Sequence, residues 1–191
     1  MIVFLIGFMG CGKSTVARGL AQCSGWEQID LDQRVCQDVG VDTVAEIFAT
    51  LGEAEFRRLE RKAIESLPTE GNLIVATGGG APCVGDNMEL LVSKGITVYL
   101  KMSAEALSER LQHVRVVRPK IVGKSPEELY DYVATLLAER EPYYSRARVI
   151  VDCDGISSRV VVGRLKYLVK SAPCGRFSHQ TSESEFLTYA K

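Results

Sequence analysis

Residues 7–14, with the sequence GFMGCGKS, constrain this chain more than any other stretch. They match the phosphate-binding template of a glycine, four residues, a second glycine, a lysine and a serine. The apolar run at 1–6 is typical of a buried parallel strand, and the residues after Ser14 can continue as a helix. Backbone N–H groups and the helix dipole then favour an anion, so we expect Lys13 to reach nucleotide phosphates and Ser14 to ligate Mg²⁺. The alternative is a glycine-rich turn that happens to carry a lysine.

The size and charge of the chain fit one cytoplasmic enzyme domain. A length of 191 residues allows a core around a five-stranded sheet. The net charge of -1 gives no general attraction to nucleic acid or to a membrane surface. The N-terminus does not resemble a signal peptide, and the sequence has no apolar run of membrane-spanning length.

The six cysteines are scattered, without a C-x-x-C pair or metal-ligand spacing. We therefore expect reduced thiols rather than disulfides or a zinc site. Cys11 differs because it lies in the phosphate loop beside a lysine and a helix N-terminus, a setting that lowers a thiol pKa. We hypothesise that it reacts with thiol reagents and that bound nucleotide protects it. The alternative is an inert loop position.

Apolar runs alternate with helix-like segments along the chain. This order predicts an α/β fold in three layers (α/β/α), with a five-stranded parallel sheet of the P-loop kinase type. We expect strands at 2–6, 27–31, 72–76, 96–101 and 147–151. We expect helices at 14–23, between 33 and 66, and at 84–94, 104–112, 125–139 and 156–170.

Three segments do not fit a simple strand-and-helix alternation within the single domain expected over 1–170. Residues 33–66 are too long for one crossover and predict substrate-binding helices above the site. Residues 112–124 are basic, contain proline and glycine, and predict a lid. The polar tail at 171–191 has the composition of a disordered segment and is expected to add little to the core.

Two acidic residues, Asp30 and Asp32, are expected to close the second strand. Alternation along a strand places both carboxylates on one side, at the sheet edge where α/β proteins bind ligands. One carboxylate can hold the water ligands of Mg²⁺, and the other can take or orient a hydroxyl proton. The alternative is that Asp32 caps a helix and Asp30 is solvated.

A charged helical face is predicted from Glu53, Arg57 and Glu60, which lie at positions i, i+4 and i+7. An arginine held between two carboxylates is oriented before any ligand arrives and can grip a substrate carboxylate. The alternative is a surface salt-bridge face, which is what we expect of Arg58 and Arg61.

A glycine triplet, Gly78–Gly80, follows the third strand and removes every Cβ at a point where a ring or hydroxyl can approach the backbone. A tight turn is the alternative. Arginines at 110, 115 and 118 lead through the predicted lid, and Arg140 is expected to end the long helix. Arg118 and Arg140 are the two we favour for neutralising charge on a transferred phosphoryl group.

Together these motifs resemble the shikimate kinase family, in the family's order and spacing, over roughly residues 1–169. The family implies that ATP and shikimate give ADP and shikimate 3-phosphate, a step in chorismate and aromatic amino acid biosynthesis. By this resemblance Asp32 is the base and contacts the shikimate hydroxyls. Arg57 and Arg140 bind the carboxylate, and Gly79 and Gly80 touch the ring hydroxyls.

The resemblance also implies roles at the nucleotide. Ser14 and Asp30 would lie at Mg²⁺, Arg110 would stack on the adenine, and Arg118 would be the lid arginine that meets ATP. The phosphates would be held by Gly10, Cys11, Gly12, Lys13, Ser14 and Thr15. Catalysis is thus expected from Lys13, Asp32 and Arg118, in a monomer that binds neither nucleic acid nor membrane.

Two features depart from the family pattern. The lid reads Arg118-Pro119-Lys120-Ile121, where the family usually has two leucines after the proline, and the polar tail is not explained by the family. Two other functions stay open on the residues alone. One is another small-molecule kinase of this fold, acting on gluconate or a nucleoside monophosphate, and the other is a nucleotide-dependent binding protein without turnover.

Overall fold

The computed structural model describes residues 1–113 and 121–170. Within them a single sheet has the strand order β2-β3-β1-β4-β5, and every adjacent pair is parallel. The strands are β1 (Ile2–Ile6), β2 (Glu27–Asp30), β3 (Leu73–Ala76), β4 (Ile96–Lys101) and β5 (Val149–Asp152). The predicted five-stranded parallel sheet is therefore confirmed.

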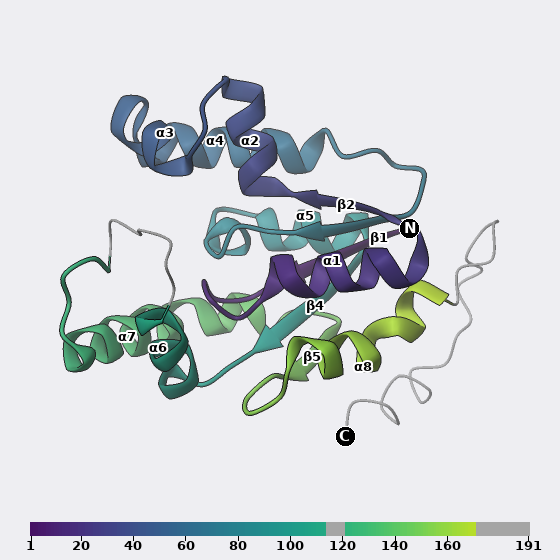
Figure 1. The fold of residues 1–191 in the computed structure, drawn as a ribbon. Coiled ribbons are helices and arrows are strands. Elements are labelled where there is room, and N and C mark those ends of the chain that lie inside the picture. The colour runs from purple at the N-terminus through teal and green to yellow at the C-terminus, as the bar shows by residue number, and fades with distance from the viewer. Residues whose placement is uncertain (114–120, 171–191) are drawn as a thin grey trace.

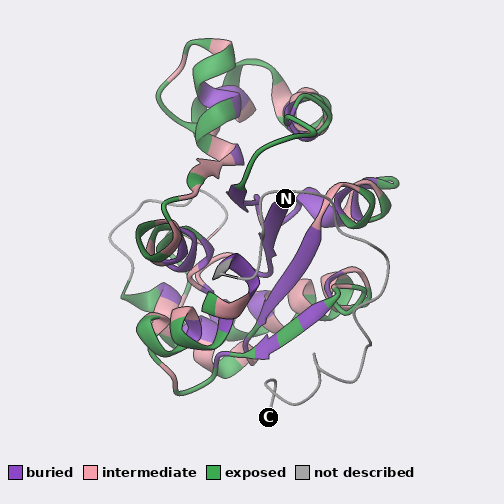
Figure 2. Cartoon of the chain, turned by 90° about the vertical axis from the view of Figure 1, so that its right-hand side faces the viewer, coloured by how far each residue is buried: buried purple, intermediate pink, exposed green. Residues whose placement is uncertain are grey.

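The core is centred on β1, which is buried along its whole length between β3 and β4. Phe4 in its middle lies opposite Val75 on one side and Thr97 on the other. The edge strands β2 and β5 are more exposed, as the green and pink segments at the sheet margins show (Figure 2). A continuous apolar run marks a strand covered on both faces, which is why the central strand was the easiest to predict.

Helices cover both faces of the sheet, which gives the three layers expected. In Figure 1, α1 and α8 lie side by side in front of the sheet and α5 lies behind it. The first four helices are α1 (Lys13–Ser24), α2 (Leu31–Val39), α3 (Val44–Thr50) and α4 (Gly52–Glu65). A short 3₁₀ turn, η1 (Ala81–Cys83), follows β3. The remaining helices are α5 (Asn87–Lys94), α6 (Ala104–Gln112), α7 (Pro126–Tyr144) and α8 (Ser158–Lys170).

The helices α2, α3 and α4 pack against one another beyond the β2 edge, at the top of Figure 1. They occupy the stretch for which substrate-binding helices were predicted. None of the helices within 1–113 and 121–170 has the length and apolar character needed to cross a membrane.

The prediction for the end of the second strand was wrong. The strand stops at Asp30 and α2 begins at Leu31, so Asp32 lies in the first helical turn rather than on a strand. The Asp30 carboxylate causes this change, because its Oδ1 accepts hydrogen bonds from the backbone N–H groups of Asp32 and Gln33. Asp30 is therefore the helix cap, a role we had considered for Asp32.

The long helix α7 also extends further than predicted. It begins with a capping box between Ser125 and Glu128 and continues past Arg140 and Pro142 to Tyr144. A proline within a helix leaves one carbonyl without its partner, which is tolerated here because Pro142 lies in the last turn. Arg140 is consequently held on a helix rather than at its end.

Part of the predicted lid, residues 114–120 with Arg115 and Arg118, lies outside the described residues, as does the tail at 171–191. The predictions made for these segments are not tested.

Candidate active site

The phosphate loop joins β1 to α1. Gly10 and Gly12 adopt φ of 86° and 98°, a region that favours glycine, and Gly12 forms the N-cap of α1. Lys13 begins the helix and is only 8% exposed. Its Nζ donates hydrogen bonds of 2.8 Å to the carbonyl oxygens of Gly7 and Phe8, so the ammonium group lies within the loop. The loop is thus preformed around a buried positive charge.

Cys11 is buried within the loop, and its Sγ lies 3.8 Å from Lys13 Nζ. Burial limits the access of a thiol reagent, so the structure favours the inert position over the reactive thiol. Protection by nucleotide stays a prediction. Five of the cysteines lie within 1–113 and 121–170, and all five are free thiols, as expected.

A hydroxyl and a carboxylate meet beside the loop. Ser14 Oγ donates a 2.7 Å hydrogen bond to Asp30 Oδ2, although the two residues come from different elements. Oxygen ligands of this kind are those that Mg²⁺ prefers. No group of three histidine, cysteine or acidic side chains suited to a metal occurs in the described parts of the chain. A cation at Ser14 and Asp30 would therefore take its other ligands from phosphate or water.

Arg57 is fixed between two carboxylates of its own helix, as the spacing predicted. Its Nη1 lies 2.8 Å from Glu60 Oε2 and its Nη2 lies 3.1 Å from Glu53 Oε1. The Arg57 side chain is 18% exposed, whereas the side chain of Glu60 is fully buried. Arg58 pairs with Glu55 and is 64% exposed, so it is the surface residue we expected.

Glu60 has an unusual environment for a carboxylate. Burial raises the pKa of Glu60 to about 7. The nearby charge of Arg57 lowers the pKa, and the charge of Asp32 raises it by a smaller amount. Glu60 Oε1 has no hydrogen-bond partner within 1–113 and 121–170. A Cβ at Gly78 would lie 2.4 Å from this oxygen and 2.6 Å from Asp32 Oδ1. The two carboxylates therefore converge on Gly78, which the sequence did not predict.

The other glycines of the triplet face the two arginines. A Cβ at Gly80 would lie 2.6 Å from Arg57 Nη2, and one at Gly79 would lie 3.5 Å from Arg140 Nη1. A side chain at Gly80 would displace the Arg57 guanidinium, whereas a Cβ at Gly79 would make an ordinary contact with Arg140. Asp32, Arg57 and Arg140, predicted from distant parts of the sequence, lie around one glycine turn.

The phosphate loop and the glycine turn are in direct contact. A Cβ at Gly79 would lie 3.3 Å from the backbone nitrogen of Met9, and the guanidinium carbon of Arg140 lies 5.6 Å from the ring centre of Phe8. On the other side of the loop, a Cβ at Gly12 would lie 3.9 Å from Arg110 Nη1. The geometry brings together the predicted site residues that the structure describes. The roles assigned to them stay predictions.

Two tyrosines at the site were missed by the sequence analysis. Tyr144 is fully buried at the end of α7, and its hydroxyl donates to the carbonyl oxygen of Gly79. Tyr99 of β4 donates to Glu141 and packs 5.1 Å from the ring of Tyr144. The only sequence signal for Tyr144 was the pair of aromatic residues that follows Arg140, and such a pair is equally typical of a core segment.

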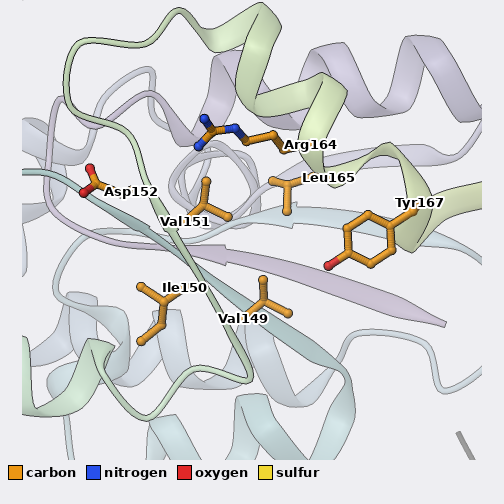
Figure 3. Close-up of a pocket in the computed structure, with 7 residues that line it drawn as sticks. All are labelled: Val149, Ile150, Val151, Asp152, Arg164, Leu165 and Tyr167. Carbon is orange, nitrogen blue, oxygen red and sulfur yellow. The ribbon is translucent and has the colours of Figure 1, made fainter. Parts of the chain in front are cut away.

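A small cavity between β5 and α8 lies elsewhere in the fold (Figure 3). Its lining includes Val149, Val151, Arg164 and Tyr167, and none of the predicted site residues contributes to it. The candidate active site is therefore the region around the glycine turn and the phosphate loop.

Comparison with known proteins identifies one family. The shikimate kinase family model matches residues 9–169. A shikimate kinase from Parabacteroides distasonis is 41% identical over 152 residues, which cover 80% of this chain and 87% of that protein. A shikimate kinase from Moorella thermoacetica is 38% identical over 169 residues, which cover 88% of this chain and 94% of that protein.

Solved structures give the same result. The crystal structure of shikimate kinase from Bacteroides thetaiotaomicron has a TM-score of 0.83 and 36% identity, and the match covers 89% of this chain and 98% of that one. The structure of shikimate kinase from Acinetobacter baumannii in complex with shikimate has a TM-score of 0.75 and 31% identity, with 89% and 93% of the chains covered.

Proposed function

Because this chain belongs to the shikimate kinase family, we propose that it transfers the γ-phosphoryl group of ATP to the 3-hydroxyl of shikimate. The products are ADP and shikimate 3-phosphate, in the biosynthesis of aromatic amino acids. The observation that carries this proposal is the convergence of Asp32, Arg57 and Arg140 on the glycine turn beside the phosphate loop. A ring that bears both a carboxylate and hydroxyl groups matches this set of side chains.

The acceptor carboxylate binds to Arg57 and Arg140 in this proposal. Arg57 is already held by Glu53 and Glu60, so little side-chain entropy is lost when the acceptor arrives. Two guanidinium groups with a common target can fix the orientation of a planar carboxylate. Gly79 and Gly80 leave the space for the ring to approach the backbone.

Asp32 then acts on the hydroxyl that attacks the phosphorus. Its carboxylate accepts the hydroxyl proton, or orients the hydroxyl, as the oxygen approaches the γ-phosphorus in line with the leaving ADP. The neighbouring Glu60 has a pKa of about 7, so one of the two carboxylates can stay protonated near neutral pH. This arrangement avoids two like charges at the point of transfer.

The nucleotide phosphates bind in the loop from Gly10 to Thr15. Lys13 exchanges its contacts with the carbonyls of Gly7 and Phe8 for contacts with phosphate oxygens. Ser14 and Asp30 supply the oxygen ligands, or hold the waters, of a magnesium ion. When bound, Mg²⁺ neutralises charge on the β- and γ-phosphates.

The remaining proposed roles belong to residues expected to lie against the bound nucleotide. Arg110, which lies beside the loop at Gly12, stacks on the adenine. The lid role predicted for Arg118 falls on residues outside the described ones and stays a prediction. A monomeric state and a cytoplasmic location stay predictions.

An assay of ADP release tests the proposed function. The chain is supplied with Mg·ATP and one acceptor at a time from shikimate, gluconate and AMP, and the product is identified by phosphorus NMR. We expect release with shikimate alone and phosphorylation at its 3-hydroxyl. Faster release with gluconate or AMP would indicate another small-molecule kinase. Binding of ATP and shikimate without any release of ADP would indicate a binding protein.

A further inference from the structure

Tyr144 contacts the glycine turn of the acceptor site. Its side chain is fully buried at the end of α7, and its hydroxyl donates a hydrogen bond to the carbonyl oxygen of Gly79. Arg140 lies one helical turn earlier, and its Nη1 would lie 3.5 Å from a Cβ at Gly79. The phenol and an arginine of the acceptor site thus meet at the same glycine.

The hydroxyl is a permanent donor. Burial raises the pKa of Tyr144 above its ordinary value, and only part of this rise is offset by the nearby Arg140 charge. The phenol therefore stays protonated at every pH at which the enzyme would work. Its proton is available for the Gly79 carbonyl whether or not a ligand is bound.

The bond to Gly79 fixes more than one carbonyl group. In a planar trans peptide, the carbonyl of Gly79 and the N–H of Gly80 point in opposite directions. A peptide between two glycines rotates more easily than any other, so an external contact is needed to hold it. Within 1–113 and 121–170, the N–H of Gly80 has no hydrogen-bond partner. It is therefore free to donate to an acceptor oxygen.

We propose that Tyr144 is a positioning residue for the acceptor. Its hydroxyl holds the peptide between Gly79 and Gly80, beside the guanidinium of Arg140, in the geometry that receives a ring hydroxyl. This inference rests on the proposed function. It adds a residue that does not itself touch the acceptor.

A purely structural role is the competing explanation, because the Tyr144 ring packs against Tyr99 in the core. Phenylalanine at 144 keeps that packing and removes only the hydroxyl. Tyr130 provides a matched control, since it lies on the same helix and its hydroxyl bonds to Glu105 at 3.0 Å, away from the site. Tyr144→Phe removes a hydrogen bond to the glycine turn, whereas Tyr130→Phe removes a hydrogen bond to Glu105.

The test is steady-state kinetics of Tyr144→Phe and Tyr130→Phe with both substrates. We expect Tyr144→Phe to raise the KM for shikimate about tenfold, because the hydrogen bond that holds the glycine peptide is lost. Its kcat and its KM for ATP should stay within about twofold of the unsubstituted enzyme, since neither the loop nor Asp32 is altered. Tyr130→Phe should change none of the three constants.

Two further measurements separate positioning from folding. Denaturation curves show whether each variant is folded at the assay temperature. If Tyr144→Phe is not, calorimetric titration with shikimate at a lower temperature gives the same comparison. Replacing Tyr144 with p-aminophenylalanine keeps a donor in place and should bring the KM for shikimate back to within about twofold.

An unchanged KM for shikimate in a folded Tyr144→Phe variant would overturn the inference. So would an equal rise in the KM for both substrates, or a loss of stability as the only effect. Failure of the unsubstituted enzyme to phosphorylate shikimate would instead overturn the proposed function, so the two failures are distinguishable.

Discussion

The phosphate loop and the acceptor site are adjacent, yet they are built in different ways. The loop is one continuous segment whose backbone conformation is set by glycines at positive φ. The acceptor site takes its side chains from α2, α4, the glycine turn after β3, and α7. A continuous motif carries its own geometry, whereas a site assembled from four segments depends on how the helices pack on the sheet.

The two regions also hold their positive charges differently. Lys13 is held by backbone carbonyls of its own loop, and Arg57 is held by two carboxylates of its own helix. The contacts of the lysine are to neutral carbonyl groups, whereas those of the arginine are to charged carboxylates. Substitutions in the loop should therefore abolish transfer, and those in the acceptor site should act on one substrate or one step.

The largest effect is expected from Lys13→Ala. Loss of the ammonium group, for which we propose contact with the β- and γ-phosphates, should lower kcat/KM by about 10³ or more. Initial rates of ADP release measure this loss, and thermal unfolding verifies that the variant is folded. Lys62→Ala, at an exposed position of α4, is the control and should keep full activity. Residual activity of Lys13→Ala within tenfold of the control would contradict the role of the loop lysine.

Asp32→Asn should have the next largest effect. It would separate, within the acceptor site, an effect on the chemical step from an effect on acceptor binding. The amide cannot accept the hydroxyl proton, so kcat should fall by about 10²–10⁴ while the KM for ATP stays constant. Asp38→Asn is the control, because Asp38 lies on the same helix with an exposed partner, Arg34. Single-turnover rates provide the measurement. A variant with normal kcat would mean that Asp32 does not act on the hydroxyl.

Arg57→Ala should act on acceptor binding rather than on turnover. Loss of a charged, two-pronged contact should raise the KM for shikimate about 10- to 100-fold and leave the KM for ATP unchanged. Arg58→Ala is the matched control, since Arg58 is its neighbour and pairs only on the surface. If both variants bind shikimate equally well, the carboxylate is held elsewhere.

The last prediction concerns stability rather than activity, and Glu60→Gln tests it through the dependence of the free energy of unfolding on pH. The pKa of Glu60 is about 7 in the folded chain, against an ordinary value of 4.5. Between these values the folded chain binds more protons than the unfolded chain, so this residue lowers the free energy of unfolding as pH rises from 4.5 to 7. The loss should be on the order of 2–3 kcal/mol and should disappear in Glu60→Gln.

Urea denaturation at several pH values gives the comparison for Glu60. The control is Glu65→Gln, a carboxylate of the same helix that is 53% exposed. The difference between unsubstituted protein and Glu60→Gln should change with pH, and the control should follow the unsubstituted protein. Parallel curves for all three proteins would show that Glu60 is ionised throughout this range.

Several site contacts were predictable because they depend on local spacing. The phosphate loop template and the i, i+4, i+7 pattern around Arg57 are properties of short segments. The position of Asp30 beside the phosphate loop also followed, because parallel strands bring their carboxyl ends to one edge. The start of α2 was mispredicted, because a short acidic segment can end a strand or cap a helix, and only the Asp30 hydrogen bonds decide between them.

The sequence by itself determined the family, the parallel sheet and the position of the phosphate loop, because these follow from local patterns of apolar residues, glycines and charges. Only the tertiary structure decided that Glu60 and Asp32 converge on Gly78, and that the Tyr144 hydroxyl bonds to the glycine turn. The physical reason is burial. The pKa of a carboxylate and the hydrogen-bond partner of a phenol both depend on the neighbouring groups, and those groups come from distant segments of the chain.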